Sequence, residues 1–214
     1  PATGFRITPV RPIDELWAAA RRAAPPVQEP ARSPFDLVEL TSLEPTLRCE
    51  LAYAGDDNFL GTRIYERPVA KLQRPAAEAL RRAHARLASE GLGLVVLDAY
   101  RPWSVTKLFW DATPAELHHF VADPEQGSRH NRGCAVDVTL CDLETGERVE
   151  MPSGFDEFTV RAYADYPGGT SRQRHFRERL RRAMAAEGFT VNAHEWWHFD
   201  FVDWQSYPVG NEPL

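Results

Sequence analysis

Two histidines and two carboxylates stand at spacings that could perform metal chemistry. His130 and Asp137 lie seven residues apart, and Glu195 and His198 lie three apart near the C-terminus. Two imidazoles and one carboxylate can hold a divalent metal ion and leave a coordination position open, as in catalytic zinc sites. A glutamate beside the last ligand could move protons for a water that the metal activates. The pattern therefore favours a metal site that carries out hydrolysis.

Each of these residues also has an ordinary structural interpretation. His130 could be a polar loop residue, Asp137 a partner in a turn, His198 a core histidine bonded to the backbone, and Glu195 a surface carboxylate. Non-haem iron oxygenases use the same three ligand types. In those enzymes the first histidine and the carboxylate usually lie two residues apart, as H-x-D, whereas His130 and Asp137 lie seven apart. Glu195 also has no evident role in oxygen activation. Hydrolysis is the better interpretation of the set as a whole.

The spacing of Glu195 and His198 sets a geometric condition. Residues three apart on an extended strand face opposite sides. Both side chains can therefore reach one site only if the chain turns at or near Glu195, so that the strand starts around Trp196. The aromatic neighbours Trp196 and Trp197 predict a partly dry wall that would raise the pKa of Glu195 toward neutrality.

Hydrophobic periodicity predicts the elements that must position these residues. We expect helices at residues 12–24, 75–88, 104–111, 113–121 and 171–188, and strands at residues 36–40, 48–53, 93–97, 134–141 and from 189 onward. Thr113 and Ser171 are the expected N-caps of their helices. The fold class that follows is α+β, with a mainly antiparallel central sheet flanked by helices. Residues 1–214 are expected to form one domain, with about residues 1–50 as an N-terminal extension packing on the core.

Two predicted strands carry candidate site residues. In the strand 134–141 the alternation of side chains turns Asp137 away from the aliphatic face. Arg101 follows the buried strand 93–97 in a polar loop, which is a favoured position for working residues. Arg101 could equally be structural and pair with Asp98.

Composition and charge exclude several classes of protein. The net charge of −6 argues against a nucleic-acid partner, because such proteins normally need a basic face. The exception, Arg172 to Arg182, is expected to be an amphipathic helix with a solvated arginine face. No apolar run approaches the ~20 residues of a membrane span, so no membrane partner is expected. The sequence leaves a homo-oligomer open.

The cysteines indicate the compartment. Cys49, Cys134 and Cys141 form neither a disulfide framework nor a C-x-x-C pair. A reducing, cytoplasmic location is expected. Because the sequence begins with Pro1 and not Met, a removed leader remains an alternative.

Several ordered motifs together resemble the D-alanyl-D-alanine dipeptidases, a family of zinc metallopeptidases related to the zinc D-Ala-D-Ala carboxypeptidases. The motifs are Asn58–Gly61, Asp98–Pro102, Ser128–Leu140, Met151–Phe158, Leu180–Phe189 and Glu195–Phe199. The resemblance implies one Zn²⁺ per chain, held by His130, Asp137 and His198. It also implies that Glu195 is the catalytic base and that Arg101 stabilises the tetrahedral intermediate.

The same resemblance implies how a substrate would be held. Asp156 would receive the free ammonium group of the substrate, and Ser128 and Tyr100 would be neighbouring contacts. The implied partner is a small dipeptide, and the implied function is hydrolysis of D-Ala-D-Ala or a closely similar dipeptide by metal-activated water. Two alternatives remain: a D,D- or L,D-carboxypeptidase that acts on peptidoglycan peptides, and an inactive metal-binding or peptide-binding relative. The same ligands also bind cobalt, nickel or iron.

Overall fold

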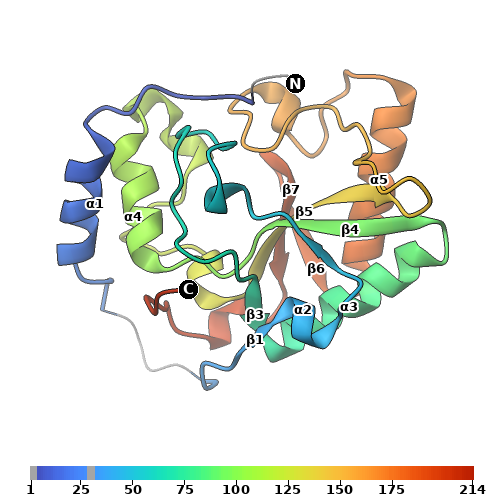
Figure 1. Cartoon of the computed structure of the whole chain (residues 1–214), viewed down its shortest axis with the longest axis horizontal. Coiled ribbons are helices and arrows are strands. Elements are labelled where there is room, and N and C mark those ends of the chain that lie inside the picture. The colour runs from blue at the N-terminus through green and yellow to red at the C-terminus, as the bar shows by residue number, and fades with distance from the viewer. Residues whose placement is uncertain (1–3, 28–31) are drawn as a thin grey trace.

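A five-stranded sheet forms the centre of the computed structural model, which describes residues 4–27 and 32–214 (Figure 1). Its strands, in spatial order, are β2 (Arg48–Cys49), β4 (Leu92–Asp98), β5 (Ala135–Asp142), β7 (Glu195–Phe201) and β6 (Phe189–Asn192). All neighbouring strands are antiparallel except the pair β2 and β4. A separate antiparallel pair joins β1 (Leu37–Glu39) to β3 (Lys71–Gln73). The predicted α+β class with a mainly antiparallel sheet is confirmed.

Helices flank this sheet on both sides of the view in Figure 1. They are α1 (Ile13–Arg22), α2 (Leu40–Leu43), α3 (Arg74–Ala88), α4 (Trp103–Ala112) and α5 (Ser171–Ala185). Helices α3 and α5 pack on each other and on the sheet, and α1 packs on α4. Helix α3 starts where the sequence predicts, with Pro75 in its first turn. No described helix is long and apolar enough to cross a membrane.

The alternation predicted for β5 separates two faces of the sheet. Val136 and Val138 enter the main core, which includes α3 and α5, whereas Cys141 packs with Val95 and Leu97 in a smaller cluster. Asp137 shares the face of Cys141, because residues an even number of positions apart lie on the same side of a strand. Both faces of β5 are nevertheless buried. The carboxylate therefore lies in a protected environment.

Local chemistry corrects three predicted elements. The N-cap of α5 is Thr170, because its hydroxyl accepts from the Gln173 N–H while the Gln173 side chain accepts from the Thr170 N–H. Thr113 caps no helix start; its hydroxyl donates to the Phe109 carbonyl at the end of α4. The strand expected at 48–53 stops at Cys49, and a short 3-10 helix follows at Ala52–Ala54.

The three cysteines carry free thiols. Burial raises the pKa of Cys49 to about 11 and that of Cys134 to about 12. Both thiols therefore stay protonated near neutral pH and are poor nucleophiles.

Candidate metal centre and active site

One row of polar residues crosses three neighbouring strands and defines the centre of the site. Asp98 of β4 pairs with Asp137 of β5, and Asp137 pairs with His198 of β7. Directly paired residues point to the same face of a sheet, so the three side chains meet. A β-bulge between Val96 and Asp98 is what brings Asp98 into this row, since regular pairing would place Leu97 opposite Asp137.

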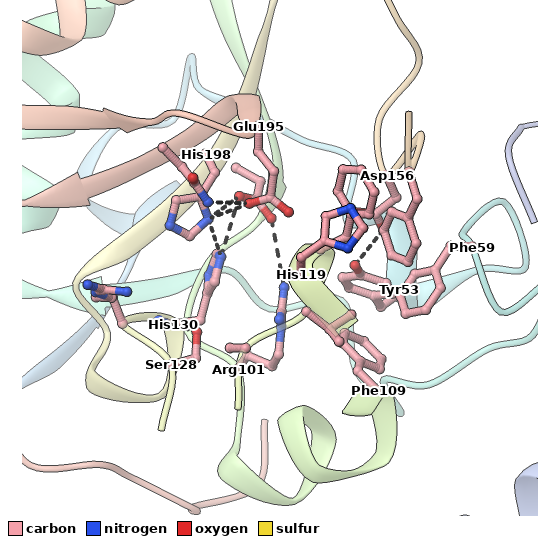
Figure 2. Close-up of a pocket in the computed structure, with 17 residues that line it drawn as sticks. Tyr53, Phe59, Arg101, Phe109, His119, Ser128, His130, Asp156, Glu195 and His198 are labelled. Atoms are coloured by element: carbon pink, nitrogen blue, oxygen red, sulfur yellow. Dashed lines mark hydrogen bonds and ion pairs between the residues drawn. The ribbon is translucent and has the colours of Figure 1, made fainter. Parts of the chain in front are cut away.

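The third candidate ligand comes from the loop before β5. His130 begins a short 3-10 helix, His130–Arg132, which ends at Gly133 with a φ of 64°. In Figure 2 the imidazoles of His130 and His198 point toward each other. The Nε2 atom of His130 lies 3.1 Å from Nδ1 of His198 and 3.4 Å from Oδ1 of Asp137. The His198 Nδ1 to Asp137 Oδ1 distance is 3.0 Å.

These three distances fit a metal centre. A tetrahedral ion with ligand bonds of about 2.0–2.1 Å separates its ligand atoms by about 3.3 Å, close to the observed spacing. The outer nitrogen of each imidazole is already engaged: His130 Nδ1 donates to the Ala99 carbonyl at 2.7 Å, and His198 Nε2 donates to Asp200 at 2.9 Å. Such outer bonds fix the tautomers that leave the inner nitrogens as acceptors. Three acceptors therefore converge on one point.

The electrostatics of this point favour a cation. Burial opposes the charged form of Asp137, but the neighbouring imidazoles of His130 and His198 outweigh it and hold its pKa well below the usual range. Burial likewise opposes a charge on His198, yet Asp200 and Asp137 raise the pKa of this imidazole well above its usual value. A positive charge is thus stabilised where the three acceptors meet.

Arg101 forms the structural pair considered for it and also lies close to one of the candidate metal ligands. Its Nε donates to Asp98 at 2.9 Å, so it does form the structural pair. One terminal nitrogen also lies 3.8 Å from Oδ2 of Asp137, beside the metal centre. The guanidinium lies 4.8 Å from the ring centroid of Phe109 and 5.4 Å from that of Tyr53, and it is buried. A buried, clamped arginine beside a metal centre is suited to meet an oxyanion.

The chain turns immediately before Glu195, as the spacing required. Asn192 pairs with Glu195 across the tight turn between β6 and β7. The Glu195 carboxylate lies 3.7 Å from His198 Nδ1 and accepts a 2.9 Å hydrogen bond from the Asn192 amide. Burial raises its pKa above the usual value, although the charge of His198 opposes this.

The prediction that Trp196 and Trp197 form an aromatic wall beside Glu195 was wrong, because neither indole lines the cavity. Trp196 donates its indole N–H to Ser153, and Trp197 packs on Phe155. Other aromatic residues line the cavity in front of the metal centre: Tyr53, Phe59, Phe109, Phe120 and Phe158. The error arose because residues adjacent in sequence were assumed to share the surroundings of Glu195.

Asp156 lies across this cavity from His198 (Figure 2). It is buried, and its φ of 53° makes it the one non-glycine residue with a positive φ in the described ranges. Tyr53 donates a 2.5 Å hydrogen bond to its carboxylate. Burial, assisted by the charges of Asp137 and Glu195, raises the pKa of Asp156 well above its usual value. Backbone strain held at a buried carboxylate is typical of a binding position.

The cavity has a volume of about 220 Å³ and joins most of the predicted site residues. Its lining includes Arg101, Ser128, His130, Asp137, Asp156, Glu195 and His198. The hydroxyl of Ser128 accepts from the His130 N–H at 3.2 Å, which orders the ligand loop. Tyr100 is the exception and a correction: its hydroxyl donates to Glu212, and its ring packs on Phe35 outside the cavity.

Several residues of the site escaped the sequence analysis. Asp200 stands two positions after His198 on the same strand, so a period of two could have indicated it. Asn192 lies three residues before Glu195 and could have been considered as its partner. Tyr53 and His119 gave no local signal, since both reach the cavity only through the tertiary fold.

An α+β domain whose sheet and an adjoining loop present two histidines, an aspartate and a glutamate to one cavity has the features of a metallopeptidase. The comparisons with known proteins specify the family. The family profile described as D-ala-D-ala dipeptidase matches residues 34–209, and the chain belongs to this family.

Curated relatives agree with this assignment. The D-alanyl-D-alanine dipeptidase of Escherichia coli is 37% identical over 81% of this chain and 89% of its own length. That of Enterococcus faecalis is 34% identical over 76% of this chain and 89% of its own length. The solved structure of the LdcB LD-carboxypeptidase matches with a TM-score of 0.46 and 18% identity over 79% of this chain and 69% of that one. A similarity that weak supports no functional inference.

Proposed function

We propose that this protein is a zinc-dependent dipeptidase that hydrolyses D-Ala-D-Ala or a closely similar small dipeptide. The observation that carries the proposal is one cavity with a His-Asp-His centre on one side and a buried carboxylate, Asp156, on the other. Its volume of about 220 Å³ is below the ~300–1,000 Å³ of pockets for drug-sized ligands, which favours a small substrate. The names of the curated relatives support the same substrate.

His130, Asp137 and His198 would hold the zinc ion, because their acceptor atoms already have tetrahedral spacing. When bound, zinc polarises a scissile carbonyl and lowers the pKa of a water molecule toward ~7. The donor set of two imidazoles and one carboxylate also suits cobalt, nickel or iron. We propose one zinc per chain because of the nitrogen and oxygen donors and their spacing.

Two side chains around the centre would carry out proton transfer and stabilise the negative charge of the transition state. Glu195 would accept the proton of the attacking water and deliver it to the departing amine, and the hydrogen bond from Asn192 would fix its carboxylate. Arg101, held by Asp98, would pair with the negative charge that develops on the carbonyl oxygen. One such donor contributes about 3 kcal/mol to lowering the barrier.

Asp156 would bind the ammonium group of the substrate and so restrict the chain length. A buried carboxylate needs a counter-charge, and Asp156 lines the cavity while one of its oxygens accepts from Tyr53. A peptide with an acylated N-terminus would bring no positive charge to this position. The proposal therefore distinguishes a dipeptidase from a carboxypeptidase, which would accept N-blocked peptides.

The decisive experiment compares substrates on metal-free and zinc-restored protein. We expect D-Ala-D-Ala to be cleaved only after zinc is restored, and N-acetyl-D-Ala-D-Ala to be cleaved at least about 10-fold less efficiently in kcat/KM. Preferential cleavage of the N-acetylated compound, or of an N-blocked tripeptide, would favour the carboxypeptidase alternative. Zinc binding with no cleavage of any dipeptide or N-blocked peptide would favour the inactive relative.

A further inference from the structure

The proposed dipeptide substrate is a zwitterion, and its negative end needs a partner. Asp156 accounts for the ammonium group, but nothing assigned so far receives the carboxylate. An extended residue spans about 3.3–3.6 Å, so the two charged ends of a dipeptide lie about 7 Å apart on either side of the scissile bond. A cation on the side of the metal centre that faces away from Asp156 would meet this carboxylate.

Two arginines line the cavity, and only one of them has no role assigned at the reacting centre. Arg101 is buried, bonded to Asp98 and stacked on aromatic rings, so it is committed to the reacting centre. Arg129 also lines the cavity, and its side chain is 48% exposed. In the described part of the chain its guanidinium makes no hydrogen bond. Its nearest acidic atom is Oδ2 of Asp200, 3.6 Å from Nε.

Arg129 is nevertheless held in place. Its guanidinium carbon lies over the ring of Trp204, 4.6 Å from the centroid, in a cation–π contact that occupies none of its N–H donors. Its neighbour in sequence is the candidate ligand His130. An ordered, planar group with open donors matches the two oxygens of a carboxylate.

The contacts also place Arg129 at the required end of the cavity. Asp200 accepts from the outer nitrogen of His198 through Oδ1 and approaches Arg129 through Oδ2. Arg129 therefore lies on the His198 side. Figure 2 shows His198 and Asp156 on opposite sides, with Glu195 and Arg101 between them. The cavity thus has a negative end, a reacting centre and a positive end.

The negative charge of Asp200 does not cancel this positive end. Arg132 lies on the same ring, 5.6 Å from the centroid of Trp204, so Arg129, Arg132 and Asp200 together carry a net charge of about +1 at neutral pH. Asp200 is in addition hydrogen-bonded to His198. Arg132 itself donates to the Tyr207 carbonyl and does not line the cavity.

We propose that Arg129 binds the C-terminal carboxylate of the substrate and makes the enzyme selective for dipeptides with a free C-terminus. This inference rests on the proposed dipeptidase function. It adds a specificity residue that recognises a carboxylate, distinct from the groups that carry out hydrolysis. A dipeptide amide would lose this contact and keep every other one.

The test compares D-Ala-D-Ala with D-Ala-D-Ala amide. The wild-type protein should prefer the free acid by about 10- to 100-fold in kcat/KM, because a charge-assisted hydrogen bond of about 1.5–3 kcal/mol is at stake. Arg129→Ala should lower kcat/KM for the acid by a similar factor, mainly through KM, and leave the amide almost unchanged. Arg129→Glu should make the acid the poorer of the two substrates.

Arg132→Ala is the matched control, since it removes a second arginine from the same tryptophan ring without touching the cavity. It should keep most of the preference for the acid, because the local net charge falls but the donors of Arg129 remain. Zinc affinity, measured by competition with a chelator, should be the same in Arg129→Ala and wild type. Equal losses for acid and amide together with weaker zinc binding would overturn the proposal, because Arg129 would then act through Asp200 on His198.

Calorimetric binding of the two compounds to zinc-loaded Glu195→Gln protein separates this inference from the proposed function. Tighter binding of the acid, lost on adding Arg129→Ala, supports the carboxylate contact whether or not the wild-type protein turns over. Equal binding of acid and amide overturns it, even if D-Ala-D-Ala is hydrolysed. Failure of wild-type turnover alone counts against the proposed function.

Discussion

The two sides of the cavity are built in different ways. On one side Asp137 and His198 are buried, directly paired residues of neighbouring strands, and a β-bulge adds Asp98 to the same row. On the other side Asp156 lies in an irregular segment, in a backbone conformation that non-glycine residues seldom adopt, and depends on Tyr53 for its hydrogen bond. Strand pairing positions two of the three candidate metal ligands, whereas a loop carries the group proposed to select the substrate.

This difference separates chemistry from selectivity. Strand positions hold side chains to within fractions of an ångström, as a metal ion and a proton transfer require. Loops can change without disturbing the sheet and often carry binding residues. We therefore expect changes on the sheet side to reduce kcat and changes on the loop side to raise KM.

Glu195→Gln should give the largest effect of the series. The glutamine keeps the size of the side chain and can still accept from Asn192, but it cannot accept the proton of the attacking water. We expect kcat to fall by about 10²- to 10⁴-fold, with zinc content by elemental analysis unchanged. A variant with wild-type kcat would remove Glu195 from the proposed mechanism.

Asp156→Asn should show the opposite kinetic signature. Asparagine tolerates a positive φ, so the backbone at this position is preserved while the negative charge is lost. We expect KM for D-Ala-D-Ala to rise by about 10- to 100-fold and the discrimination against the N-acetylated substrate to disappear. If kcat fell and KM did not change, the division between the two sides of the cavity would be wrong.

Tyr53→Phe should produce a smaller change of the same kind. Among the described residues it removes the one side-chain donor to Asp156, while the ring stays among Phe59, Tyr65 and Phe109. A hydrogen bond to a charged group is worth about 1.5–3 kcal/mol, and a solvating water would recover part of it. Steady-state kinetics should show KM raised by less than in Asp156→Asn, with kcat within about 2-fold of wild type.

A substitution outside both sides of the cavity should change stability slightly and leave catalysis unaffected. Glu187 pairs with Arg82 and Arg86 of α3, and hydrogen bonds from these arginines lower its pKa. Because both arginines are half exposed, Glu187→Gln should cost less than about 1 kcal/mol in urea unfolding and leave kinetics unchanged.

The lowered pKa of Glu187 fixes the pH dependence of this loss. A depressed carboxyl pKa stabilises the fold above the pKa of the unfolded chain, near 4.3. The stability difference between the variant and wild type should therefore be full at neutral pH and vanish as the pH falls through the folded pKa. A difference that grew in acid would contradict the ion pairs.

Much of the fold and of the metal centre is visible in the sequence, because strong local patterns encode them. The alternation around Asp137 predicts its face, and the spacing of Glu195 and His198 requires the turn that the structure contains. Thr170 and Gln173 encode the capping box of α5 locally, but the adjacent Ser171 has the same capping chemistry, so the sequence alone did not identify the N-cap residue.

The remaining features depend on contacts between distant residues. The bulge that brings Asp98 opposite Asp137 leaves no mark in a run of buried residues. Tyr53 and Asp156 are 103 positions apart and meet only when the sheet and the loop are assembled. Tyr100 is a third case: the resemblance implied a substrate contact, but its hydroxyl donates to the C-terminal segment at Glu212.

The direct pairing of Asp137 with His198 has a consequence for how the protein matures. A slip of one residue between β5 and β7 would send one of the two side chains to the opposite face. Chains with misaligned strands would then bind the metal ion more weakly. The fraction of chains that retain the ion would therefore measure the fraction with the correct strand register. Through mass action, the ion would in turn favour the aligned form over its competitors.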